Sequence, residues 1–350
     1  MKLHGLATGI GSLPYVQADE ALEQVFKYVP NIPFWPQLPK RDKREGMSAQ
    51  YLQHIAPVPQ SEEGDVFGTF AYDNVDSRLE KFYEKITQQD IDYFKITRDY
   101  ALGLYAFKEK IQANPALLKQ IEFIKCGITG PFTIGASIKD EDGKAYLYDP
   151  IAMQALIEGL AMKALWQIKF LSEFNKKIIM FIDEPYLAGF GSAYTPLTRE
   201  YVVSGLTELS VKIRAGGVLV GVHCCGNTDW SILTDTKTID IINFDASAFM
   251  DKFVLYASNI GAFLKRGGII CWGIVPTQEF TGQETASQLV DKIKSGIDIL
   301  VKKGVDRELL YEKMLISPAC GLGSLDVPRA EKILKLLAQT SEILQNTPSK

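Results

Sequence analysis

The stretch GVLVGVHCCGN, residues 217–227, joins an apolar run to a cluster of metal-binding side chains. The run at 217–222 predicts a buried strand, and its end holds one of only three histidines in the chain. Residues two apart on a strand point to the same side, so His223 and Cys225 are predicted to face a common point. An imidazole and a thiolate supply half of a tetrahedral zinc site.

A third soft ligand follows another apolar run much later in the chain. Residues 314–316 are apolar, and Cys320 lies in the segment SPACG at 317–321. Three ligands from separate strand ends favour a catalytic zinc with an open position over a structural one. The alternative interpretation is a buried histidine beside a buried thiol, because cysteine is often a small core residue.

Strand-like and helix-like patterns alternate along most of the chain. Strands are expected at 6–10, 121–126, 177–182, 217–222, 239–244, 268–272 and 311–316. Helices are expected at 19–29, 90–113, 151–174, 198–215, 251–266, 284–303 and 327–345. Alternation at this density predicts an α/β fold with a parallel sheet, and the near-eight units favour a single (β/α)8 TIM barrel over an open doubly wound sheet.

The proline-rich stretch at about 34–90 is the least regular part of the chain. We expect it to be an excursion over the barrel mouth within one catalytic domain spanning 1–345, with a frayed tail at 346–350. Catalytic residues of such barrels lie at the carboxyl ends of the strands.

Composition excludes several classes of partner. The net charge of −4 gives no electrostatic reason to bind nucleic acid or an anionic membrane. No apolar run approaches the roughly 20 residues that a membrane span needs. Five cysteines, an odd number, do not indicate a disulfide framework, so a cytoplasmic location is expected.

Acidic residues follow two other predicted strands. Asp183 and Glu184 could act on a substrate ammonium group or in proton transfer, or they could cap a helix or bind a backbone amide. Asp245 could be a fourth, displaceable oxygen ligand or a turn residue. Ser12 and Thr129 also fall at predicted strand ends.

Five segments together resemble the superfamily of cobalamin-independent methionine synthase and the uroporphyrinogen-decarboxylase-like, zinc-dependent thiol methyltransferases. The segments are IGSLP at 10–14, TGPFT at 129–133, IDEP at 182–185, HCCGNT at 223–228 and PACGL at 318–322. They span nearly the whole chain in the expected order. The long type of methionine synthase has two barrels, whereas this chain is long enough for one, and the G-V-x-D-x-H segment of the family is GIVPTQ here, at 273–278.

The resemblance implies a (β/α)8 barrel in which His223, Cys225 and Cys320 hold zinc and Asp245 matches an acidic ligand. It implies that Ile10, Gly11, Ser12 and Asp183 contact a homocysteine-like acceptor thiol. The implied activity is transfer of a methyl group to that thiol from a methyl-folate or a methyl-corrinoid protein. A corrinoid-dependent enzyme acting on another thiol, such as a coenzyme-M-like acceptor, and a non-catalytic zinc- or thiol-binding barrel are the alternatives.

Overall fold

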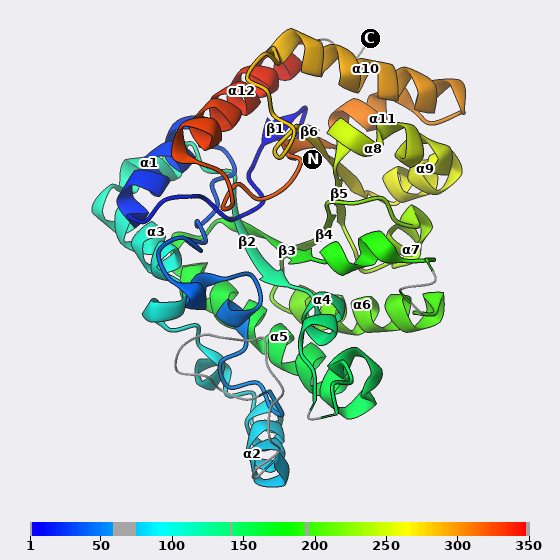
Figure 1. Cartoon of the computed structure of the whole chain (residues 1–350). Coiled ribbons are helices and arrows are strands. Elements are labelled where there is room, and N and C mark those ends of the chain that lie inside the picture. The colour runs from blue at the N-terminus through cyan, green and yellow to red at the C-terminus, as the bar shows by residue number, and fades with distance from the viewer. Residues whose placement is uncertain (1, 59–74, 141, 193–194, 196, 348–350) are drawn as a thin grey trace.

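The computed structural model describes residues 2–58, 75–140, 142–192, 195 and 197–347. Seven parallel strands form one curled sheet with helices packed around its outer face (Figure 1). The order of the strands is β1-β7-β6-β5-β4-β3-β2. Their bounds are β1 Leu6–Ala7, β2 Phe123–Thr129, β3 Lys177–Asp183, β4 Leu219–Cys224, β5 Ile241–Phe244, β6 Ile269–Val275 and β7 Met314–Pro318.

The segment at 31–37 lies between the two edge strands of this sheet. Phe34 forms an isolated parallel bridge with Lys125 of β2, and Gln37 forms one with Ser12 just beyond β1. The amide of Lys125 donates to the carbonyl of Pro33, and the amide of Leu13 donates to that of Gln37, both at 2.9 Å. The prediction of a parallel α/β sheet is confirmed as a seven-stranded curled sheet, with this segment in the place an eighth strand would take.

Most of the α-helices pack on the outside of the sheet (Figure 1). Their bounds are α1 Ala18–Tyr28, α2 Val75–Thr87, α3 Leu102–Ala113, α4 Pro131–Ser137, α5 Pro150–Leu171, α6 Arg199–Arg214, α7 Trp230–Asp235, α8 Ala246–Phe253, α9 Ala257–Lys265, α10 Ala286–Lys302, α11 Arg307–Glu312 and α12 Val327–Gln345. Within the described residues, no helix is long and apolar enough to span a membrane. Of the tail expected at 346–350, residues 348–350 lie outside the described residues, and the amides of Asn346 and Thr347 still bond to α12.

The prediction of one helix over 90–113 is wrong for its first half. Two 3-10 turns, Ile91–Phe94 and Arg98–Tyr100, precede α3. The carboxylate of Glu45 accepts the amide of Leu102 at 3.2 Å, so a side chain from the excursion satisfies the start of α3. The apolar period continued through this stretch because Phe94 and Ile96 are buried and Tyr93 and Tyr100 are half-buried, although the backbone is not α-helical.

The excursion has two parts with different places in the fold. Residues near Gln37 and Met47 reach the open end of the sheet, as expected. Helix α2 instead projects away from the sheet beside α5 (Figure 1). Residues 59–74 of the excursion lie outside the described residues.

Side chains inside the curled sheet change from apolar to polar along the strands. The amino-terminal level is a buried apolar cluster that includes Phe123, Ile179, Ile241, Ile269 and Leu315. Two to four residues further along the same strands, the side chains become Lys125, Asp183, Asn243 and Ser317. The fold therefore collects its buried polar groups toward the carboxyl ends of the strands.

Candidate metal centre

Three side chains converge beyond the carboxyl ends of β4 and β7. One ligand atom each from His223, Cys225 and Cys320 lies within 4.8 Å of the other two. His223 is within β4, Cys225 follows that strand, and Cys320 follows β7. The structure therefore brings together the three residues that the sequence predicts as zinc ligands.

His223 is held in one orientation by the neighbouring strand. His223 and Asn243 are register partners on β4 and β5, and Nδ1 of His223 donates to Oδ1 of Asn243. The amide nitrogen of Asn243 donates at 2.9 Å both to the carbonyl of Cys271 and to Oγ of Ser317. These two donations fix Oδ1 as the acceptor, so Nδ1 carries the proton and the Nε2 lone pair faces the cysteines.

The electrostatics of the group favour a thiolate. The pKa of the Cys225 thiol is lowered, first by the neighbouring thiol of Cys320 and then by the adjacent imidazole of His223. The pKa of Cys320 is raised by that neighbouring thiolate and by burial. Burial opposes charging of His223, but the adjacent thiolate of Cys225 and the charge of Asp183 raise its pKa overall. A divalent cation would bind the Nε2 lone pair of this histidine together with the thiolate.

These three residues fit zinc. Nε2 of His223 is buried and has no hydrogen-bond partner among the described residues. One imidazole and two thiols are donors that zinc prefers, and tetrahedral zinc holds its ligand atoms roughly 3.3–3.8 Å apart. The observed separations need only small side-chain adjustments to reach that range.

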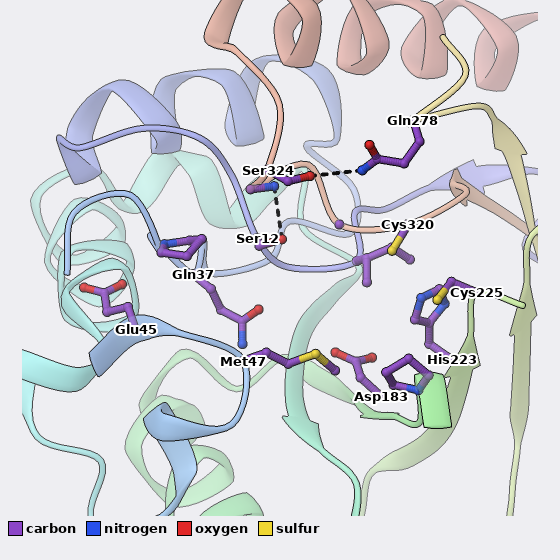
Figure 2. A pocket seen from close by; sticks show the side chains of 15 residues that line it. Ser12, Gln37, Glu45, Met47, Asp183, His223, Cys225, Gln278, Cys320 and Ser324 are labelled. Atoms are coloured by element: carbon purple, nitrogen blue, oxygen red, sulfur yellow. Dashed lines mark hydrogen bonds between the residues drawn. The ribbon is translucent and has the colours of Figure 1, made fainter. Parts of the chain in front are cut away.

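A cavity of about 270 Å³ opens beside the three ligands. Figure 2 shows Cys225, His223 and Asp183 on one side of it and Gln37 and Met47 of the excursion on the other. The full lining is Ile10, Ser12, Gln37, Pro39, Glu45, Met47, Asp183, Pro185, His223, Cys225, Gln278, Cys320, Gly321, Gly323 and Ser324. The cavity is large enough for a small amino acid next to the candidate metal ligands.

Two loops are tied together at the rim of this cavity. Gln278 donates to Oγ of Ser324 at 3.0 Å, and the amide of Gly323 donates to Oγ of Ser12 at 3.2 Å (Figure 2). A Cβ at Gly321 would lie 2.3 Å from Oγ of Ser12. The glycine after Cys320 thus permits the close approach of the loop that carries Ser12.

Asp183 points into the cavity from the end of β3. Its side chain is 8% exposed, and its Oδ1 atom is buried without a hydrogen-bond partner among the described residues. Burial raises its pKa, whereas the nearby charges of Lys125 and His223 lower it. A buried carboxylate oxygen with no partner is suited to receive a cationic ligand group.

The other residues expected to contact the acceptor do not all line the cavity. Ile10 and Ser12 line the cavity, whereas Gly11 lines a smaller cavity behind it. The hydroxyl of Thr129 donates at 2.6 Å to the carbonyl of Met47. Thr129 therefore anchors the excursion that carries Met47 to the cavity, and it is not among the residues that line it.

Glu184 does not face the cavity. Its two carboxylate oxygens accept the amides of Phe132 and Thr133 and the hydroxyl of Thr133, at 2.6–3.0 Å. Burial raises the pKa of Glu184 to about 7. The structure gives this residue the amide-binding role, at the start of α4, that was the alternative to catalysis.

Asp245 lies apart from the three convergent ligands. Its carboxylate accepts the amide of Ala248 at 2.9 Å and the hydroxyl of Ser247 at 2.6 Å. This is the geometry of a residue that caps the start of α8. The group of mutually close ligand atoms comprises His223, Cys225 and Cys320.

Sequence reasoning missed three polar residues around the site. Asn243 and Lys125 are polar residues that interrupt apolar strands, and this interruption was a usable signal. Gln37 belongs to the irregular excursion, where no period relates it to a strand end. Its amide nitrogen donates at 2.8 Å to both Gln50 and the hydroxyl of Tyr51.

Comparison with known proteins gives a curated relative and solved structures that are similar to this chain. No protein-family model matches the chain. A curated methionine synthase from Methanocaldococcus jannaschii is 24% identical over 274 residues, which cover 76% of this chain and 74% of that protein. A solved B12-independent methionine synthase from a Shewanella species, in complex with selenomethionine, aligns with 18% identity and a TM-score of 0.44. That alignment covers 67% of this chain and 66% of the solved one.

The curated relative matches the present chain over most of the length of both proteins. The chain thus resembles a protein named methionine synthase over most of its sequence.

Proposed function

We propose that this protein is a zinc-dependent S-methyltransferase that transfers a methyl group to the thiol of a homocysteine-like acceptor. The observation that carries the proposal is the convergence of His223, Cys225 and Cys320 at a cavity that also contains the buried carboxylate of Asp183. Similarity to a protein named methionine synthase supports a methyltransferase. The scaffold would be a (β/α)8-type barrel in which residues 31–37 act as the eighth strand.

His223, Cys225 and Cys320 would hold the zinc, and Asn243 would orient the imidazole. Bound zinc would lower the pKa of an acceptor thiol and so supply a nucleophilic thiolate at neutral pH. Two anionic cysteine ligands would keep that sulfur electron-rich. The free thiols of the chain fit a reducing compartment such as the cytoplasm.

Asp183 would bind the ammonium group of the acceptor. Its Oδ1 atom has the capacity for a charge-assisted hydrogen bond, and its strand position places it beside His223, its register partner on β4. An acceptor held by its amino group at one end and its sulfur at the other has a fixed direction of attack. Restricting the acceptor in this way lowers the entropic barrier to transfer.

The methyl donor would enter from the rim, where Gln278 and Ser324 are hydrogen-bonded. We propose a methyl-folate or a methyl-corrinoid protein as donor, and an assay with each, using homocysteine as acceptor, decides between them. Formation of methionine from either donor supports the proposal. A protein that binds zinc stoichiometrically and binds thiols tightly but transfers no methyl group from any donor would be a binding protein instead.

Metal analysis of four variants tests the ligand set. His223→Ala, Cys225→Ser and Cys320→Ser are each expected to lose most of the bound zinc. Cys224→Ser is the matched control, because Cys224 is buried next to the site and its thiol faces the carbonyl of Gly226. Full zinc occupancy in His223→Ala and Cys320→Ser would refute the assignment.

A further inference from the structure

Lys125 is a buried lysine inside the curled sheet, directly behind the cavity. Its side chain is 1% exposed. Its ammonium group donates to the carbonyl of Ile10 and lies 4.7 Å from the centre of the Phe181 ring. Burying an unpaired ammonium group is costly, so this position requires compensating negative groups.

Asp183 is the acidic group that Lys125 faces. A Cβ added to Gly127 would lie 3.7 Å from Nζ of Lys125 and 4.0 Å from Oδ2 of Asp183. Both charged groups therefore lie over the same glycine, whose missing side chain leaves them room. The opposite charges stabilise each other in an environment with little water.

The two groups that Lys125 faces also line the ligand cavity. Ile10 and Asp183 are on the cavity wall, and Lys125 reaches them from behind. A second cavity of about 10 Å³ is lined by Lys125, Ile10 and Asp183, and Tyr51 and Gln37 add further polar groups to its lining. This volume is about that of one bound water molecule.

We propose that Lys125 is a positioning residue for the amino end of the acceptor, an inference that rests on the proposed function. It holds the Ile10 loop against β2 and balances the charge of Asp183, so that an oriented carboxylate meets the ammonium group of the acceptor. The site would then select thiols that carry an amino group, and Lys125 would contribute to that selectivity without touching the ligand. If Lys125 acted only through its positive charge, it would repel the ammonium group of the acceptor, and its removal would strengthen binding. If Lys125 positions Asp183, its removal weakens binding.

The test compares two thiols that differ in one group. Homocysteine and 4-mercaptobutanoate share the thiol and the carboxylate, and the second lacks the amine. In Lys125→Met, calorimetric Kd values for the zinc-loaded protein should be about tenfold or more weaker for homocysteine and nearly unchanged for 4-mercaptobutanoate. Lys125→Gln, which keeps a donor for the Ile10 carbonyl without the charge, should show the same selectivity loss if the methionine variant does not fold.

Lys163→Met is the matched control. Lys163 is also fully buried, and its ammonium group donates to the carbonyl of Lys95 at 3.1 Å, on α5 and outside the residues that line the cavity. This control should leave both affinities unchanged. Equal weakening of both thiols in the Lys125 variants, or unchanged or tighter homocysteine binding, would overturn the inference. Failure of the unmodified zinc protein to bind homocysteine would instead count against the proposed function.

Discussion

His223 and Asn243 pair across β4 and β5, and Nδ1 of the imidazole donates to the amide oxygen of Asn243. Asn243 is fully buried, and its other two hydrogen bonds leave it one orientation. This arrangement explains why Nε2 of His223 faces the two cysteines. It also makes Asn243 a residue that acts on metal affinity without contacting the metal.

Asn243→Ala should weaken zinc binding by about 10- to 100-fold, because the imidazole loses the partner that fixes its tautomer and orientation. Competition with a chromogenic chelator measures this change. Ser317→Ala removes only one partner of Asn243 and should have a smaller effect. Equal zinc affinity in Asn243→Ala and the unmodified protein would show that the orientation of His223 does not depend on this bond.

Asp245→Ala separates a helix cap from a metal ligand. We expect a loss of about 1 kcal/mol in the free energy of unfolding, because the amide of Ala248 loses its acceptor, and no change in zinc affinity. Asp326→Ala, at the corresponding cap of α12, should have a similar cost. A large loss of zinc affinity in Asp245→Ala alone would make Asp245 a ligand.

Asp183 and Glu184 should give different results although they are adjacent. Glu184→Ala leaves two amides and a hydroxyl without their acceptor and should destabilise the protein by about 3 kcal/mol or more, as seen in chemical denaturation. Asp183→Asn should cost less stability than Glu184→Ala, because Oδ1 of Asp183 has no hydrogen-bond partner among the described residues and the loss is confined to the charge that balances Lys125, and it should weaken homocysteine binding. Weaker homocysteine binding in Glu184→Ala, with the larger loss of stability in Asp183→Asn, would make Glu184 the functional acid.

Lys163 should make stability depend on pH. Burial lowers its pKa from 10.5 to about 7, so between these values the unfolded chain binds more protons than the folded one. Its contribution to stability is therefore highest above pH 10.5 and is lost as the pH falls toward 7. The stability gain of Lys163→Met over the unmodified protein should be larger at pH 6 than at pH 9 by on the order of 3 kcal/mol. Denaturation curves at both values measure the gap, and a constant gap would contradict the lowered pKa.

The strand ends were predictable because parallel strands bring their carboxyl ends to one edge. This rule, with the two-residue period, was enough to place His223, Cys225, Cys320 and Asp183 near one cavity. The side-chain roles of Glu184 and Asp245 were less predictable. Each carboxylate follows a strand and precedes a helix, and only the turn geometry decides whether it bonds to an amide or faces the cavity.

Contacts that depend on the register between strands could not be predicted from the sequence. The pairing of His223 with Asn243 needs the alignment of two strands 20 residues apart. The short β1 and the bridging segment at 31–37 carry little periodic signal, because few of their residues are regular strand. The strand expected at 311–316 begins later, at Met314, because Asp306 caps the short helix α11 and holds residues 311–312 within it.

The most direct measurement is a zinc-edge X-ray absorption spectrum of the zinc-loaded protein, with and without homocysteine. Without the acceptor, one nitrogen and two sulfur neighbours from His223, Cys225 and Cys320 are expected. With homocysteine, the account predicts a third sulfur at about 2.3 Å. A spectrum with no sulfur ligands, or one that homocysteine leaves unchanged at saturation, would contradict it.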